Sequence, residues 1–190
     1  EGLMRMGRAM VVVAFVQVLL GALVAGIDAG RSFPEWPLMA GAVSAQVVPL
    51  VGGTPPVQDF DSLATSGTSS ALPDGWYLSE TGNNGPTSYT ASNGGANSGD
   101  TYSFGTTAER ALGALASNSV QSKIGAQLRN DSGQALTEIA VAYTGEQWRL
   151  GAAGRADSLL FNYSLNATSL SDAAATWVAV SALDLVAPIT

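Results

Sequence analysis

Neither cysteine nor histidine occurs in this chain of 190 residues, and lysine occurs once. Zinc sites, cysteine and serine–histidine nucleophile systems and histidine-ligated haem all depend on the two missing residues. The sequence therefore excludes those sites and leaves carboxylates, tyrosine, hydroxyls and one lysine for any chemistry. Disulfides are excluded as well, so the fold depends on its core alone.

Charge is also scarce, because only 12% of the residues are charged, with eight basic and fifteen acidic side chains and a net charge of −7. Nucleic-acid binding needs clustered Lys and Arg that displace counterions, and the few basic residues are scattered. We therefore expect no nucleic-acid partner and no acidic or polyanionic one.

The net charge divides the chain into two unlike parts. Residues 1–45 carry three acids and three bases, whereas residues 46–190 hold the whole net charge of −7. Within the first part, residues 9–27 form an uncharged run in which Gln17 is the one polar residue. As a helix this run would extend roughly 28 Å, close to the hydrocarbon thickness of a bilayer. The sequence thus predicts a single N-terminal transmembrane helix and outer loop in residues 1–45.

The basic residues around this run predict its orientation. Arg5 and Arg8 precede it and Arg31 alone follows closely, which favours a cytoplasmic N-terminus and places the rest of the chain on the outer side. The alternative is a cleaved signal peptide, although the apolar core of such a peptide is usually shorter. In that case the second part would be secreted.

Residues 20–30 (LGALVAGIDAG) and 31–39 (RSFPEWPLM) resemble a transmembrane helix and outer loop of the haem A synthase family. The resemblance covers residues 15–41, about a fifth of the chain. It implies descent from, or joining to, a piece of that membrane enzyme, whose haems are bound by paired histidines. Because this chain has no histidine, we expect it to bind no haem.

The second part follows a linker at residues 46–57, which is rich in Pro and Gly. Residues 58–190 contain short apolar runs of period two between Gly, Asn and Ser clusters, which predict a mainly β, antiparallel β-sandwich of jelly-roll type. The expected strands are Val57–Leu63, Trp76–Glu80, Thr87–Ala91, Thr101–Gly105, Arg110–Ala116, Lys123–Arg129, Leu136–Tyr143, Gln147–Gly151, Leu159–Asn166 and Trp177–Leu185.

Several segments of this part resemble a β-sandwich module of large secreted bacterial surface proteins. They are residues 60–63 (FDSL), 72–77 (LPDGWY), 99–105 (GDTYSFG), 143–151 (YTGEQWRLG) and 154–157 (GRAD), and the resemblance covers about residues 57–190. The resemblance implies an extracellular, non-catalytic accessory domain. It also leads us to expect that the module continues beyond Thr190.

One cluster of charged residues surrounds a tryptophan in the most motif-like segment. Paired carboxylates are the groups that glycosidases use, but arginines among them favour ion pairs that fix a strand and its loop. We predict a structural or ligand-contact role and no catalytic residue. The cluster consists of Glu146, Trp148, Arg149, Arg155 and Asp157.

Four aromatic residues could form a sugar-stacking face, but in a sandwich we assign most of them to the core and at most one to the surface. They are Trp76, Tyr77, Tyr102 and Trp148. The acidic residues also suit a structural calcium site, because calcium takes carboxylate and carbonyl oxygens, but we favour the interpretation that they are solvated surface carboxylates. The candidate calcium ligands are Asp59, Asp61, Asp100, Asp157 and Asp184, although their spacing fits no known calcium loop.

Two hypotheses follow for the function. The chain is a non-catalytic extracellular module that binds a glycan or a neighbouring protein domain and is tethered to a bacterial inner membrane by residues 9–27. Alternatively, it is a fragment of a haem A synthase, a membrane oxidoreductase of haem A biosynthesis, joined to an unrelated secreted domain and inactive as it stands.

Overall fold

The computed structural model describes residues 47–53, 55–82, 87–117, 119–150, 153–154 and 156–189. The predicted membrane span at residues 9–27 lies outside these ranges, as does the rest of residues 1–45. Among the residues described, no helix has the length and apolarity needed to cross a membrane.

The described part of the chain is mainly β, as the sequence predicts. Its strands are short, and one 3₁₀ turn accompanies them. The elements are β1 (Val48–Leu50), β2 (Thr68–Ser69), β3 (Trp76–Thr81), β4 (Tyr89–Ser92), β5 (Asp100–Phe104), β6 (Ala111–Leu115), β7 (Gln121–Ala126), β8 (Leu128–Asn130), β9 (Ser158–Leu159), β10 (Asn162–Tyr163), β11 (Val178–Ala179), η2 (Ser181–Leu183) and β12 (Leu185–Val186).

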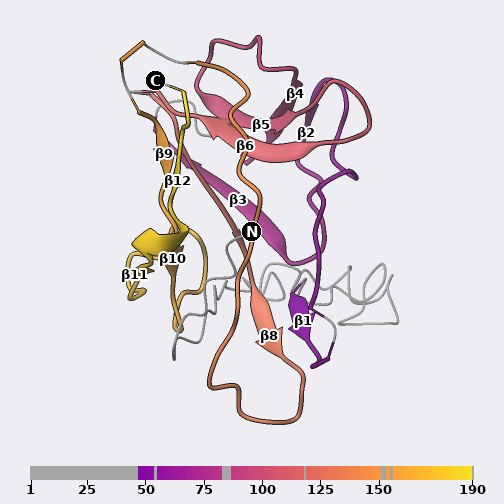
Figure 1. Ribbon diagram of the computed structural model, residues 1–190, viewed down its shortest axis with the longest axis vertical. Coiled ribbons are helices and arrows are strands. Elements are labelled where there is room, and N and C mark those ends of the chain that lie inside the picture. The colour runs from indigo at the N-terminus through magenta and orange to yellow at the C-terminus, as the bar shows by residue number, and fades with distance from the viewer. Residues whose placement is uncertain are drawn as a thin grey trace, which may run out of the picture.

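A four-stranded sheet with the order β2-β4-β5-β6 lies at one end of the molecule (Figure 1). Its middle strands, β4 and β5, are parallel, and the outer pairings are antiparallel. The buried residues of β5 alternate Tyr and Phe on one face with Thr and Ser on the other. Both faces of this strand are therefore covered, which makes β5 the centre of the fold.

The longest pairing joins β3 and β7 in antiparallel register from Trp76 opposite Ala126 to Thr81 opposite Gln121. Both strands contact β5, so this pair packs against the four-stranded sheet. Leu78 and Ile124 face each other across the pair, where apolar and β-branched side chains stabilise a ladder.

Strand β1 forms a parallel pair with β8 at the end away from the four-stranded sheet (Figure 1). The predicted linker at residues 46–57 thus contains a strand. The β1 backbone passes so close to residue 75 that glycine is required there. Gly75 has a φ of +77°, and a Cβ on it would lie 2.5 Å from the Val48 nitrogen.

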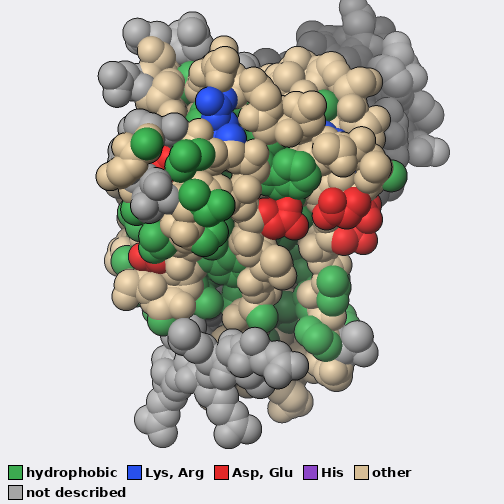
Figure 2. Space-filling model, turned by 45° about the horizontal axis from the view of Figure 1, so that its top comes forward, with side chains coloured by type: hydrophobic (Ala, Val, Ile, Leu, Met, Phe, Trp, Pro, Cys, Tyr) green, Lys and Arg blue, Asp and Glu red, His purple; other side chains and the backbone are tan. Residues whose placement is uncertain are grey.

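The core is small. The buried apolar side chains are Leu63, Tyr89, Tyr102, Phe104, Val120, Ala167 and Leu170. Large hydrophobic side chains also remain on the surface, among them Val57 and Leu160, and Figure 2 shows green apolar atoms exposed among the polar ones. Short strands with small residues bury little apolar area, which explains why the core is small and large hydrophobic side chains stay exposed.

The predicted strand Val57–Leu63 is wrong, because side chains there satisfy the backbone locally. Gln58 Oε1 accepts a hydrogen bond from the Phe60 nitrogen at 2.7 Å, and Asp59 Oδ1 accepts one from the Asp61 nitrogen at 3.1 Å. Phe60 has a φ of 65°, which a strand does not permit. Such local bonds compete with strand pairing and produce a turn.

The C-terminal half also departs from the prediction. Leu136–Tyr143 and the described residues of Gln147–Gly151 form no strand, and the two last predicted strands are reduced to the two-residue pairs β10–β11 and β12–β9. Apolar alternation is present at Ile139 and Val141, but no neighbouring strand pairs with it. The two packed antiparallel sheets of a jelly-roll sandwich are not confirmed; small, partly parallel sheets occur instead.

Candidate functional site

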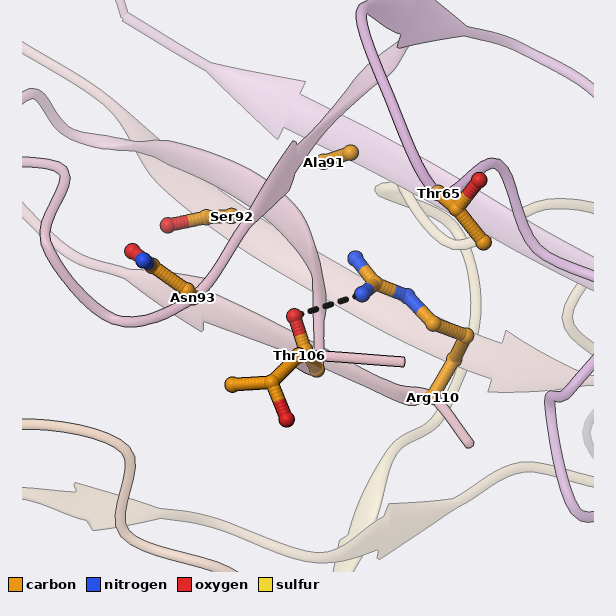
Figure 3. A pocket seen from close by; sticks show the side chains of 7 residues that line it. Thr65, Ala91, Ser92, Asn93, Thr106 and Arg110 are labelled. Atoms are coloured by element: carbon orange, nitrogen blue, oxygen red, sulfur yellow. Dashed lines mark hydrogen bonds between the residues drawn. The ribbon is translucent and has the colours of Figure 1, made fainter. Parts of the chain in front are cut away.

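A polar pocket of about 420 Å³ opens where β4 and β5 end (Figure 3). Its lining residues come from the loop before β2, from β4 and its following turn, and from the segment between β5 and β6. They are Thr65, Ala91, Ser92, Asn93, Gly105, Thr106 and Arg110. Figure 3 shows the Arg110 guanidinium between Thr65 on one side and Ser92 and Asn93 on the other.

Arg110 is 3% exposed, and its side chain is fixed by three groups of the β5 strand end. Its Nε donates to Ser103 Oγ at 2.8 Å, one terminal nitrogen donates to the Gly105 carbonyl at 2.6 Å, and the other donates to the Ser103 carbonyl. Among the described residues, no carboxylate forms an ion pair with this guanidinium. The pocket thus contains a buried guanidinium whose N–H groups donate to neutral hydroxyl and carbonyl oxygens.

The local sequence explains how Arg110 reaches this position. Its backbone nitrogen donates to Asp61 Oδ1 at 3.0 Å, which ties the start of β6 to the turn around Phe60. Gly105 has a φ of +154°, and a Cβ there would lie 2.3 Å from the Glu109 carbonyl oxygen. Glycine therefore permits the tight loop that folds Arg110 back over the end of β5.

The lining suits hydrogen bonding to a neutral polar ligand. Thr65, Ser92 and Thr106 contribute hydroxyls, and Asn93 contributes an amide, so donors and acceptors are both present. No carboxylate lines the pocket. The arrangement can form hydrogen bonds to the hydroxyl groups of a ligand.

The cluster predicted around Trp148 is only partly brought together. Trp148 Nε1 donates to Glu146 Oε2 at 2.8 Å, and its ring stacks on Phe104 with centroids 6.1 Å apart. Arg149 donates to the Ala96 carbonyl and, at 2.6 Å, to Asn97 Oδ1. The predicted ion pair of Arg149 with a neighbouring carboxylate is therefore wrong, because backbone and amide oxygens of an adjacent loop bind this arginine instead.

The remaining members of the predicted cluster are Arg155 and Asp157. Arg155 is outside the described residues, and the Asp157 carbonyl accepts a hydrogen bond from the Ala187 nitrogen at 2.8 Å beside the β12–β9 pair. Glu146 and Arg149 have different hydrogen-bond partners. The structural or ligand-contact role of the cluster as a whole stays a prediction.

None of the four aromatic residues considered for sugar stacking is fully exposed. Tyr102 is 3% exposed, and Trp76, Tyr77 and Trp148 are half-buried. Burial raises the pKa of the Tyr102 phenol, and the nearby Asp100 carboxylate raises it further. Tyr102 alone of these four rings is buried in the core, so the assignment of most of them to the core is not confirmed, and none of them lines the pocket.

The five aspartates considered as calcium ligands are dispersed. Asp59 and Asp61 share the turn around Phe60, Asp100 begins β5, and Asp184 Oδ1 accepts a hydrogen bond from the Phe161 nitrogen at 2.8 Å. Across the ranges that the structure describes, no group of three or more acidic side chains could hold a metal ion.

Sequence reasoning missed Arg110 as a site residue and treated it only as the beginning of a strand. One signal was available, because glycine precedes it by five residues at the end of an apolar strand, where a tight return is expected. Its burial and its bonds to β5 depend on tertiary packing that spacing does not encode.

Comparison with known proteins confirms the first resemblance. The profile of a family described as cytochrome oxidase assembly protein matches residues 1–68. The haem A synthase of Ruegeria sp. (strain TM1040) is 58% identical over 43 residues, which are 23% of this chain and 11% of that protein. That of Cereibacter sphaeroides (strain ATCC 17025) is 69% identical over 36 residues, 19% of this chain and 9% of the relative.

The haem A synthase of Dinoroseobacter shibae is 79% identical over 28 residues, 15% of this chain and 7% of the relative. The chain therefore spans at most 11% of the length of these curated relatives. No solved structure matches the chain. The resemblance of the second part to secreted β-sandwich modules is not confirmed by any of these comparisons.

Proposed function

We propose that the β-rich part is a non-catalytic binding module for a neutral glycan, tethered to a membrane by residues 9–27. The polar pocket around Arg110 is the observation that carries this proposal. Its volume of about 420 Å³ lies within the range of small-ligand sites, and its rigid guanidinium needs no reordering on binding.

A neutral sugar fits this lining better than an acidic one. Sugar hydroxyls both donate and accept hydrogen bonds, as do the three hydroxyls and the amide around Arg110. The net charge of −7 disfavours a polyanion at long range.

The test titrates the full chain in detergent with a panel of neutral oligosaccharides. Asn93→Ala and Thr106→Ala remove exposed lining groups and should each weaken binding about tenfold, the loss of one good hydrogen bond. Thr176→Ala, at an exposed position away from the lining, serves as the matched control and should bind normally. Binding that is unchanged in both pocket variants contradicts the proposal.

The tether is supported by the uncharged run at residues 9–27 and by the haem A synthase match over the same residues. The positive-inside rule places the β-rich part on the outer side of a bacterial inner membrane. Replacing Leu20 by Arg should release a reporter fused to the chain from the membrane fraction, because a charge at the centre of a span is costly. Retention of the Leu20→Arg fusion contradicts the tether.

A second proposal follows from the family match, since residues 1–68 resemble a small part of a haem A synthase. Here the chain is a piece of that enzyme joined to an unrelated domain and is inactive as it stands. Without histidine it lacks the haem ligands of the family, so a Soret band after purification from haem-supplied cells is not expected. If the reading frame upstream of Glu1 encodes further spans with paired histidines, that result would favour this alternative.

A further inference from the structure

Glu80 on β3 is a buried carboxylate with one bare oxygen. The residue is 9% exposed. Its Oε1 accepts hydrogen bonds from the Thr101 nitrogen and the Thr101 hydroxyl, both at 2.6 Å, and from Ser122 Oγ at 3.2 Å. Its Oε2 is buried and has no hydrogen-bond partner.

A buried charged oxygen without a donor is unfavourable unless a cation compensates it. No ion pair compensates Glu80, since within the described ranges the one ion pair joins Arg129 and Asp131. Three donors converge on Oε1, whereas no donor in the described part of the chain reaches Oε2.

A second carboxylate lies directly beside Glu80. The Thr101 nitrogen is 2.6 Å from Glu80 Oε1 and 2.9 Å from Asp100 Oδ1, so one donor contacts both acids. Asp100 Oδ2 accepts the Thr90 hydroxyl at 2.9 Å. Two acids that share one donor repel each other unless a positive charge separates them.

The surrounding atoms are hard oxygens, which calcium prefers and which it binds in irregular geometries. We propose that this cluster binds one calcium ion where β3, β4, β5 and β7 meet. The ligand set consists of Glu80, Thr90, Asp100, Thr101 and Ser122. Asp100 is half-buried and provides the route of entry from solvent.

An ion at this position would link the β3–β7 pair to the four-stranded sheet. Glu80 and Ser122 belong to the β3–β7 pair, whereas Thr90, Asp100 and Thr101 belong to the four-stranded sheet. An ion bound to both groups would hold the two sheets together. Of the aspartates that the sequence suggests as calcium ligands, Asp100 alone takes part, and Glu80 was not among the candidates.

The experiment titrates the full chain in detergent with calcium chloride by calorimetry and follows thermal unfolding in calcium and in EDTA. We expect binding of one ion, a higher Tm in calcium, and a smaller increase in magnesium. Asp100→Asn should weaken calcium binding about tenfold or more, because the charge count of the ligands sets affinity. Glu80→Gln should abolish the dependence of Tm on calcium.

Asp131→Asn is the matched control, because Asp131 is an exposed carboxylate paired with Arg129 on the surface. This variant should bind calcium as the unchanged chain does. Because Glu80→Gln could fail to fold, Asp100→Asn, at the half-buried edge, provides an independent readout. Equal Tm values in calcium and EDTA, or unchanged affinity in Asp100→Asn, overturn the proposal.

Discussion

At the scale of single residues, Arg110 shows why a buried cation is retained in a chain with so few charges. Its planar guanidinium satisfies the Ser103 hydroxyl, the Ser103 carbonyl and the Gly105 carbonyl together. Lysine carries its donors on one atom and cannot reach all three acceptors. The residue therefore holds the end of β5 and shapes the pocket at the same time.

Replacing Arg110 by Lys should lower the free energy of unfolding by about 3 kcal/mol, because buried acceptors lose their donors. Urea unfolding measures the change. Arg129→Lys is the control, since Arg129 lies on the surface in its pair with Asp131, and its urea midpoint should stay the same. Equal midpoints for the two variants would show that the Arg110 bonds contribute nothing to stability.

Asp172 provides a second test at a single residue. The Thr168 hydroxyl and the Ala174 nitrogen donate to its carboxylate and hold the pKa of Asp172 below its ordinary value. Because the folded pKa is lowered, this contribution to stability is present above the unfolded pKa and is lost as the pH falls through the folded one. Thr168→Val should raise the pKa of Asp172 toward its ordinary value.

An NMR titration of the Asp172 carboxyl carbon measures that shift. Ser171→Ala is the control, because the Ser171 hydroxyl faces the Ser169 hydroxyl at 3.5 Å, and this variant should leave the titration unchanged. A Thr168→Val titration that overlays that of the unchanged chain would show that the Thr168 hydroxyl is not the main cause.

Residues with local roles were easier to predict than residues with tertiary ones. The core position of Tyr102 follows from alternation along one strand. Glu80 and Arg110 gain their roles from other strands, through Thr101 and Ser103 respectively. Such contacts depend on which strands pack together, and the spacing of residues does not specify that.

At the scale of elements, strands were predictable where several apolar and β-branched residues alternate. The predicted Trp76–Glu80 and Thr101–Gly105 correspond closely to β3 and β5. Val57–Leu63 failed because its polar side chains form turns, and Leu136–Tyr143 failed because no strand pairs with it. Alternation thus identifies a strand only where a partner strand exists.

The segment around Trp148 is a predicted strand without a partner strand in the described part of the chain, and its contribution to stability can be measured. The Trp148 ring is half-buried and stacks on the Phe104 ring, with the ring centroids 6.1 Å apart. It therefore contributes packing, although the described residues around it pair with no strand. Trp148→Ala should lower the free energy of unfolding by about 1 to 2 kcal/mol, less than a fully buried tryptophan would. Urea unfolding measures this loss.

Glu146→Gln is the matched control, because the amide oxygen still accepts the Trp148 Nε1 hydrogen bond. It should unfold at the same urea concentration as the unchanged chain. If Trp148→Ala kept full stability and lost glycan binding, the ring would be an exposed binding platform and the packing role would be wrong.

At the scale of the whole molecule, the family match and the β fold overlap. The match covers residues 1–68, yet β1 and Leu63 belong to the folded part. The shift in charge and composition near residue 46 is the basis on which the sequence predicts a boundary there. It could not show that residues 47–68 form contacts with strands much later in the chain.

These contacts allow a test of where the folding unit begins. Leu63 is 3% exposed, the Ala64 nitrogen donates to the Tyr89 hydroxyl at 3.1 Å, and the Ala64 carbonyl accepts the Ser103 hydroxyl at 3.0 Å. Burial of Leu63 contributes about 2 kcal/mol, and each buried group left unpaired costs about 1 to 3 kcal/mol. Together these losses approach the whole stability of a small domain.

A chain beginning at residue 47 should therefore unfold cooperatively in urea, with the β-type circular dichroism spectrum of the described part. A chain beginning at residue 69 should lose that cooperativity, because Asp61, Leu63 and Ala64 are absent and the Arg110 amide loses its acceptor. Equal urea midpoints for the two chains would place the start of the folding unit after residue 68. In that case the stretch matched by the haem A synthase family would be dispensable for the β fold.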